Sequence, residues 1–576
     1  MKLRLWLVTA AAGLVLADAS IVTLALPELL RELDTTVEGV AAVIAVYTIV
    51  LAAALLPAER LMRRSDPTLV GAAGFVLFGF ASAACAVADS LSFLLVARAI
   101  QAVGGAAGLV AAFSLIDGGA PAGRRHWLGA AVLSSAVGPA LGGALTQAFD
   151  WRAIFIVQVP LAAVAALAAL KGEKAAEEVA AADAAAAATV GPDGTLVQPP
   201  PLDDAHVSGP IRLLPAAALA FLSAALTAVL FLLVLLLVAG WAISPLAAAA
   251  TVTILPLAAL GGSRIGGPPR QRAAAGSLLV GGGVLALAWI PDAHVAWTFL
   301  PQALAGVGMG MALPAFAGEL LPERTPHDAA WLLTIRHAGI AVVLIALAPL
   351  IANKLDSSTE RAKERGVALV LDAKLPPQDK LELAPSLLSG VDADQPRAGL
   401  EKQLDANRAQ FDGEDLVLYD KLAVRADETL VTAVGEAFKW AFVIAGSLAI
   451  AAGAMLLFAG GGGGAAAGRA SPALALVVLV LAVPAVYAGL NAAIAPEPVK
   501  IADPCEDRQM PNSGGLTGLL QDAALTAVDA GACRLRVSRE ELVLALADDA
   551  SAKRFEERHG IDPRSVTSVL GGLLNP

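Results

Sequence analysis

Long apolar runs separated by short polar loops dominate the pattern along this chain. A helix needs about 20 apolar residues to cross a bilayer, and thirteen stretches meet that length. Six of them precede a polar stretch and seven follow it. The pattern therefore predicts an all-α polytopic membrane protein. The expected spans are residues 5–26, 38–57, 68–88, 91–116, 127–149, 152–170, 213–239, 243–262, 273–291, 295–318, 329–352, 436–459 and 472–494.

Composition agrees with a membrane protein. Of the 576 residues 57% are hydrophobic, and the mean hydropathy is +0.70, which is more apolar surface than one soluble core could bury. The chain has no phosphate-binding glycine loop, no zinc-ligand spacing and no nucleophile motif. We therefore expect no enzyme activity, no metal, no cofactor and no nucleic-acid partner.

The distribution of the spans predicts two six-helix bundles related by pseudo-symmetry around a midplane cavity. These bundles are residues 1–170 and 213–459, joined by residues 171–212. That linker is rich in alanine, proline and acidic residues, without a periodic apolar face, so we expect a mobile tether. A thirteenth helix lies within residues 460–495.

Basic residues predict the orientation of the chain. Arg60, Arg63 and Arg64 follow the second span, and Arg270 and Arg272 follow the eighth. Loops rich in arginine stay in the cytoplasm, which places the N-terminus and the linker there and the chain in the cell membrane. Because thirteen is odd, the C-terminus is expected outside.

Two segments are expected outside the membrane. Residues 353–434 repeat apolar positions at helical spacing, which predicts two or three amphipathic helices. They either cap the mouth or form a solvated extension without contact to the pore. Residues 496–576 predict a small helical domain whose core is marginal at that size. Cys505 and Cys533 could stabilise it as a disulfide in an oxidising location.

Charged side chains inside the spans are the candidate functional residues. Asp18 lies in the first span, where a charged carboxylate costs about 2.5–3.5 kcal/mol and so must face the bundle interior, find a partner or stay protonated. Such a carboxyl could carry a proton, or it could only hydrogen-bond a neighbouring helix. Arg98 lies one turn from Gln101 in the fourth span, and its guanidinium must face a cavity or an acid. Arg98 could alternatively be only a structural ion-pair partner.

The fifth span contains a cluster of small residues, Gly138, Pro139, Gly142 and Gly143. Glycines four apart lie on one helix face and let a neighbouring helix approach closely. The proline break is tolerated only where packed helices satisfy the freed carbonyl. The cluster therefore predicts a close-packed hinge or seal.

Several stretches resemble the major facilitator superfamily, in its multidrug-resistance drug:proton antiporter branch. The stretches are LADASIVTLALP around Asp18, ARAIQAVGG around Arg98, and GPALGG followed by DWRAIFIVQVP. The resemblance implies that Asp18 occupies an acidic position of the first helix and that Arg98 takes part in proton coupling. Arg336 matches an arginine of the eleventh helix, and His337 stands where glutamine is commoner. That histidine could join a proton path or be a packing residue.

One motif departs from that family. Its cytoplasmic gate reads G-x-L-a-D-r-x-G-r-r, whereas Glu59 and Asp66 replace the glycines here and Arg63 replaces the aspartate that caps a helix and latches the gate. Either the coupling cycle is altered or the latch has moved. The candidate gate residues are Arg60, Arg63, Arg64, Arg270 and Arg272.

Two functions remain open. The first is a secondary transporter that uses the proton gradient to export an amphipathic or hydrophobic small molecule, since the expected cavity wall is rich in alanine, valine and leucine. The second is a receptor or scaffold that does not transport and binds an extracytoplasmic protein through its two outer segments. The sequence leaves open the substrate, the direction, the stoichiometry and the oligomeric state.

Overall fold

A computed structural model gives the arrangement of the chain. It describes residues 2–116, 121–170, 189–190, 196–197, 212–321, 325–376, 379–380, 383–384, 387, 396–458, 472–497, 499–506, 515–547 and 549–563. Nearly all of them are helical. Most of the predicted tether at residues 171–212 lies outside this range; within it, β1 (Thr189–Val190) pairs antiparallel with β2 (Leu196–Val197).

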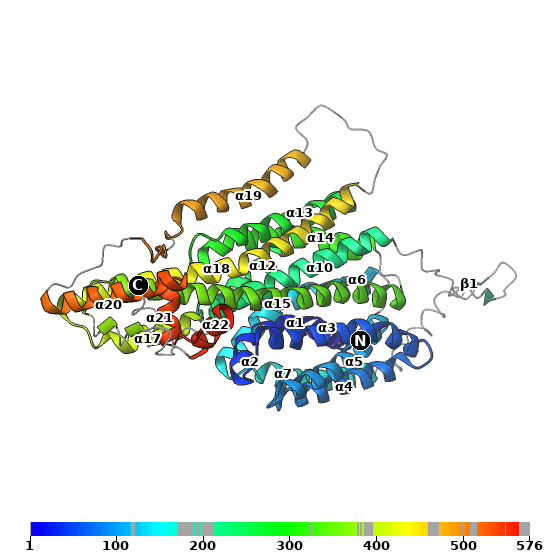
Figure 1. The fold of residues 1–576 in the computed structure, drawn as a ribbon. Coiled ribbons are helices and arrows are strands. Elements are labelled where there is room, and N and C mark those ends of the chain that lie inside the picture. The colour runs from blue at the N-terminus through cyan, green and yellow to red at the C-terminus, as the bar shows by residue number, and fades with distance from the viewer. Residues whose placement is uncertain are drawn as a thin grey trace.

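The N-terminal half is a bundle of six membrane-length helical segments (Figure 1). The expected first span ends three residues early, and a short separate helix follows it. The sixth span is made of two consecutive helices. The elements are α1 (Lys2–Thr23), α2 (Leu26–Glu32), α3 (Val37–Met62), α4 (Pro67–Ala86), α5 (Leu91–Leu115), α6 (Pro121–Ala148), α7 (Ala153–Ile156) and α8 (Gln158–Leu170).

The C-terminal half packs beside it and contains π and 3-10 turns where its helices end. Its elements are α10 (Leu213–Val234), η1 (Leu235–Gly240), α11 (Pro245–Val252), α12 (Ile254–Gly262), α13 (Pro269–Ala286), η2 (Leu287–Trp289), η3 (Val295–Thr298), α14 (Phe299–Ala315), η4 (Phe316–Leu320), α15 (Pro326–Asp372), α17 (Pro396–Arg408) and α18 (Gly413–Phe458). Four of these helices begin on proline, whose missing N–H costs nothing at the first helical position.

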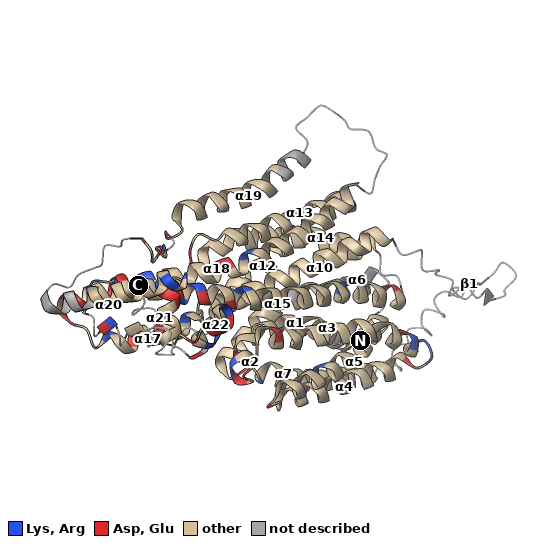
Figure 2. Cartoon of the chain, in the orientation of Figure 1, with Lys and Arg blue, Asp and Glu red and all other residues tan. Residues whose placement is uncertain are grey.

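Among the described residues, eleven helical segments are long and apolar enough to cross a membrane. The other two expected spans correspond to α6 and to α19 (Pro472–Ile494), which packs against α13. Charged side chains are sparse along the bundle and gather at its ends (Figure 2). This arrangement confirms the predicted all-α polytopic architecture.

Two helices are far longer than a bilayer requires. α15 has 47 residues and α18 has 46, or about 70 Å each at 1.5 Å per residue. The eleventh and twelfth spans thus continue unbroken into the outer segment, because charged residues stop a membrane span without stopping a helix. The amphipathic pattern is observed there: Leu400 and Leu404 of α17, together with Leu422, are buried.

The C-terminal segment folds into α20 (Gly515–Leu535), α21 (Arg539–Ala547) and α22 (Asp549–His559). It packs on the extension of α15, where Leu544 and Val367 form one apolar cluster and Arg539 pairs with Asp372 at 2.8 Å. These helices lie at the same end of the bundle as α17 and opposite β1 (Figure 1). The small core that the sequence predicts as marginal is therefore completed by α15.

Cys505 and Cys533 form a disulfide, with Cα atoms 4.9 Å apart, and the two cysteines are 28 positions apart in sequence. The bond ties the segment after α19 to α20. Replacing both cysteines with serine should lower the free energy of unfolding of this domain by about 3–4 kcal/mol, because the unfolded chain regains the entropy of an open loop. Thermal unfolding of the full chain in detergent, with and without reductant, measures this. Reductant should destabilise the wild type and leave the double variant unchanged; a wild type insensitive to reductant would contradict the prediction.

Candidate functional site

A buried ion pair lies in the middle of the N-terminal half. Oδ2 of Asp18 on α1 is 2.6 Å from Nη1 of Arg98 on α5. Both side chains have an exposed fraction of 0%. Two helices distant in sequence thus supply opposite charges to one point, which satisfies the requirement that each charge find a partner inside the membrane.

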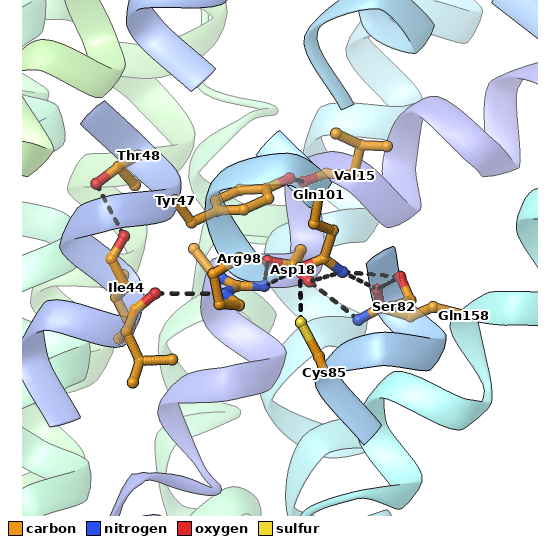
Figure 3. Close-up of polar contacts among 12 residues, drawn as sticks. Val15, Asp18, Ile44, Tyr47, Thr48, Ser82, Cys85, Arg98, Gln101 and Gln158 are labelled. Atoms are coloured by element: carbon orange, nitrogen blue, oxygen red, sulfur yellow. Dashed lines mark hydrogen bonds and ion pairs between the residues drawn. The ribbon is translucent and has the colours of Figure 1, made fainter. Parts of the chain in front are cut away.

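Amides and a hydroxyl surround this pair (Figure 3). Gln101 and Gln158 each donate through Nε2 to Oδ1 of Asp18, at 3.4 and 3.0 Å. Oε1 of Gln101 accepts from Nη1 of Arg98 at 2.5 Å, and its Nε2 also lies 2.8 Å from Oγ of Ser82. The network therefore joins α1, α4, α5 and α8, so a change in the charge of Asp18 is felt by four helices.

An aromatic face holds the guanidinium in place. The centre of the Arg98 guanidinium lies 4.2 Å from the centroid of the Tyr47 ring on α3, a cation–π contact that strengthens away from water. Nε of Arg98 donates to the carbonyl of Val43 at 3.3 Å, and the Tyr47 hydroxyl donates to the carbonyl of Val15 at 3.1 Å. Nη2 of Arg98 has no hydrogen-bond partner within the described chain.

This buried pair depends on both of its charges. With Asp18 ionised, the two opposite charges hold α1 against α5; with Asp18 protonated, Arg98 loses its counter-ion and the pair becomes costly to keep buried. Because both side chains are fully buried in this conformation, water can reach them only after the surrounding helices move.

The structure brings together Asp18, Arg98 and Gln101, as the pattern of charged residues within spans suggests. It adds Gln158, Ser82 and Tyr47, which the sequence-based candidates omit. Gln158 carried a usable signal, since it is an amide within an apolar span and belongs to the stretch DWRAIFIVQVP. Ser82 and Tyr47 carried no such signal in the sequence, because serine and tyrosine are common on packed membrane helices.

The second-half candidates lie elsewhere. Arg336 and His337 lie on α15 in the C-terminal half, whereas the Asp18 network is formed by helices of the N-terminal half. Nδ1 of buried His337 lies 2.7 Å from the carbonyl of Leu333 on its own helix.

The glycine cluster lies at two helix crossings. α6 continues through Pro139 as one helix. A Cβ at Gly138 would meet the side chain of Ser20 on α1, one at Gly142 would overlap the carbonyl of Ile21, and one at Gly143 would overlap Ala249 on α11. Because α11 belongs to the other half, the close packing at Gly143 is also a contact between halves.

The stretch Asp150–Arg152, which follows α6, is hydrogen-bonded to α2. Trp151 Nε1 and Arg152 Nη1 both donate to Oε2 of Glu32 on α2, at 2.9 and 2.7 Å. Asp150 accepts from the backbone N–H of Arg152 at 2.8 Å, which closes the turn. The hydrogen bond from Arg152, followed by that from Trp151, lowers the pKa of the Glu32 carboxyl. The turn before α7 is thus tied to α2, the short helix that follows α1.

The candidate gate arginines mostly contact their own half. Arg270 donates to the carbonyl of Leu456 and Arg272 pairs with Glu319, both within the C-terminal half. Arg60 and Arg64 are exposed. Arg63 pairs with Glu59 on α3 at 2.9 Å.

Glu59 makes one of the contacts that cross between the halves at this end. Its side chain is 1% exposed, and Oε2 lies 3.3 Å from Nδ1 of His327 on α15. Thr334 also reaches across, to the carbonyl of Ala52 on α3. The capping acid lost at Arg63 is restored nearby, since Asp66 accepts from the backbone N–H of Thr68 and caps α4.

The sequence is also similar to known proteins. The sequence profile of the Major Facilitator Superfamily matches residues 8–351. The drug efflux pump JefA of Mycobacterium tuberculosis is 32% identical over 165 residues, which are 28% of this chain and 32% of that protein. The methylenomycin A resistance protein of Streptomyces coelicolor is 31% identical over 162 residues, 27% of this chain and 34% of that protein. The matched stretch spans about a third of each relative.

A solved structure also overlays the chain. It is a bacterial homologue of the human lysosomal transporter Spinster, in an inward-facing, unoccupied conformation. The overlay covers 79% of this chain and 97% of that one, with 14% identity and a TM-score of 0.48. Because the superfamily profile covers well over half of the sequence, this chain belongs to the Major Facilitator Superfamily.

Proposed function

We propose that this protein is a proton-coupled secondary transporter that exports an amphipathic or hydrophobic small molecule across the cell membrane. The observation that carries the proposal is the ion pair between Asp18 and Arg98, fully buried and hydrogen-bonded to two glutamines. A proton that neutralises Asp18 would free Arg98 and loosen α1 from α5. The energy source is then the proton gradient, with no bound cofactor.

Contacts between the halves supply the second part of the mechanism. α3 meets α15 through Glu59 and His327, while α6 meets α11 through Gly143 and Ala249. α3 also carries Tyr47, on which the Arg98 guanidinium rests. A change of charge at Asp18 would therefore reach a helix that packs against the other half, which is what alternating access by rocking bundles requires.

The names of the relatives support export over a receptor role. They describe drug efflux and antibiotic resistance, and the alternative of a non-transporting receptor is not favoured by them. The substrate class rests on the apolar character of the spans, since a sugar would need more aromatic and amide side chains to hydrogen-bond and stack.

The orientation is part of the same proposal. Arg60, Arg63 and Arg64 follow α3, and positively charged loops stay in the cytoplasm. The outer helices α17 and α20 lie at the end of the bundle opposite β1 of the linker (Figure 1). We place the N-terminus and linker in the cytoplasm and the C-terminal segment outside.

Replacing Asp18 with asparagine tests the coupling. In proteoliposomes with an imposed pH gradient, the wild type should move protons when a hydrophobic drug is added, and Asp18→Asn should lose this flux because an amide cannot take up the proton. Asp89→Asn is a matched control, since Asp89 lies exposed in the turn before α5. The same loss in both variants, or none in Asp18→Asn, would contradict the proposal.

A further inference from the structure

A pocket lies away from the Asp18 network, at the outer end of the C-terminal half. Five parts of the chain line it: the end of α10 with η1, η2 and the turn after it, the extension of α15, α18, and the end of α19. It encloses about 960 Å³, including the space at its open mouth. It is formed within one half, so it is not part of the interface between the bundles.

The deeper wall of this pocket carries hydrogen-bond donors without acceptors. Trp241 is 4% exposed, and its buried Nε1 has no hydrogen-bond partner within the described residues. Arg365 of α15 and Lys439 of α18 are half-buried and form no ion pair in the part of the chain that the structure describes. Nζ of Lys439 lies 5.6 Å from the centroid of the Trp289 ring. A buried donor such as Nε1 of Trp241 normally has a partner, so an acceptor is missing beside it.

Acidic groups do not fill that role. Asp292 and Glu436 line the same pocket, but both are exposed to solvent. Asp292 already accepts from the backbone N–H of His294 at 2.9 Å. The two acids therefore belong to the rim, and the half-buried part of the pocket keeps an excess of positive charge and N–H donors.

The pocket lies where the apolar helices end. The membrane-length segments that reach it end at Gly240 and Trp289, and α19 ends at Ile494, next to Asn491 in the pocket wall. Two tryptophans at this level are typical of the boundary between the bilayer and water. The polar head of an amphiphile lying in the membrane would reach this depth.

We propose that this pocket binds the anionic head group of an amphiphile, a phosphate or a carboxylate, through Trp241, Arg365 and Lys439. The guanidinium and ammonium groups donate charge-assisted hydrogen bonds, and the indole N–H supplies a third donor at the inner wall. Phe442 and Leu236 give the apolar part of the ligand a surface. The site does not depend on the transport proposal, because none of its residues belongs to the Asp18 network.

Binding to the purified full chain in detergent tests the site. The probes are dioleoyl phosphatidylglycerol, dioleoylglycerol with the same tails but no anion, and inorganic phosphate. The variants are Arg365→Gln with Lys439→Gln, and Trp241→Phe, which keeps a ring but removes the N–H. Lys421→Gln is the control, since Lys421 is exposed on the same helix as Lys439 and outside the pocket. Circular dichroism and thermal unfolding without ligand check that each variant folds.

The wild type should bind phosphatidylglycerol and not dioleoylglycerol. The double variant should bind about a hundredfold more weakly, since each of its two lost charge-assisted hydrogen bonds costs roughly a factor of ten. Trp241→Phe should bind a few-fold more weakly, and Lys421→Gln should match the wild type. If inorganic phosphate alone bound the wild type, and bound the variants more weakly by the same factors, the ligand of the pocket would be a free anion and not a lipid head group. Equal binding by the folded double variant and the wild type, or equal binding of both lipids, would overturn the proposal.

Discussion

Arg98→Leu should be among the most damaging single substitutions in this protein. It leaves the Asp18 carboxylate at 0% exposure without its counter-ion, and removing one partner of a buried ion pair costs about 3–5 kcal/mol. We expect a fall of that size in the free energy of unfolding in detergent, together with loss of flux driven by a pH gradient. Thermal unfolding and proteoliposome flux measure the two effects separately.

A double substitution separates the effect on stability from the effect on transport at this site. The double variant Asp18→Asn with Arg98→Leu carries no buried charge at the pair, so it should recover much of the stability lost in Arg98→Leu. It should not recover flux, because no group remains to accept the proton.

Arg408→Leu is the matched control for the ion pair. It breaks a pair with Asp420 whose side chains are about half exposed, and such exposed pairs contribute little to stability. If Arg98→Leu unfolded no more readily than Arg408→Leu, the ion pair would not hold the N-terminal half together.

Gly142→Val should weaken both the packing of α6 against α1 and transport. The new Cβ would overlap the carbonyl of Ile21 on α1, a backbone atom that cannot rotate aside. Forcing extra carbons into a packed interface costs about 1–3 kcal/mol and occasionally more, so we expect a lower unfolding temperature and slower transport. Thermal unfolding and flux assays of the variant give both values.

Gly129→Val controls for the substitution itself. Gly129 lies on the same helix, and a Cβ there would meet no atom within 4 Å. Both variants place a β-branched residue in α6, so the difference between them reports the crossing with α1 alone. Equal behaviour of the two variants would show that α6 can move away from α1 freely.

Part of the candidate site followed from elementary energetics. A charged group inside an apolar span is costly enough that few positions qualify, and Asp18 and Arg98 were therefore identifiable one by one. Their pairing was not, since nothing in the spacing of α1 and α5 shows which faces meet. Gln158 and Tyr47 could be assigned to the network only after α8 and α3 were placed around it.

The contact between the halves shows the same limit of prediction from sequence. The sequence marks Glu59 as a departure from the gate motif and suggests that the latch could have moved. Its partner, His327, lies 268 positions away and shows no local pattern. The pairing depends on how α3 lies along α15, and many registers of two apolar helices have similar hydrophobic burial.

The sequence by itself determined the membrane class, the number of long helices and the charged residues that need partners. These properties follow from local terms, because bilayer thickness sets span length and the cost of burying a charge belongs to each residue. Only the tertiary structure decided which charges meet, that α15 and α18 continue into the outer domain, and that the C-terminal helices complete their core on α15. Those outcomes depend on packing between distant surfaces, where alternative arrangements differ little in hydrophobic area and are distinguished by shape and by a few polar contacts.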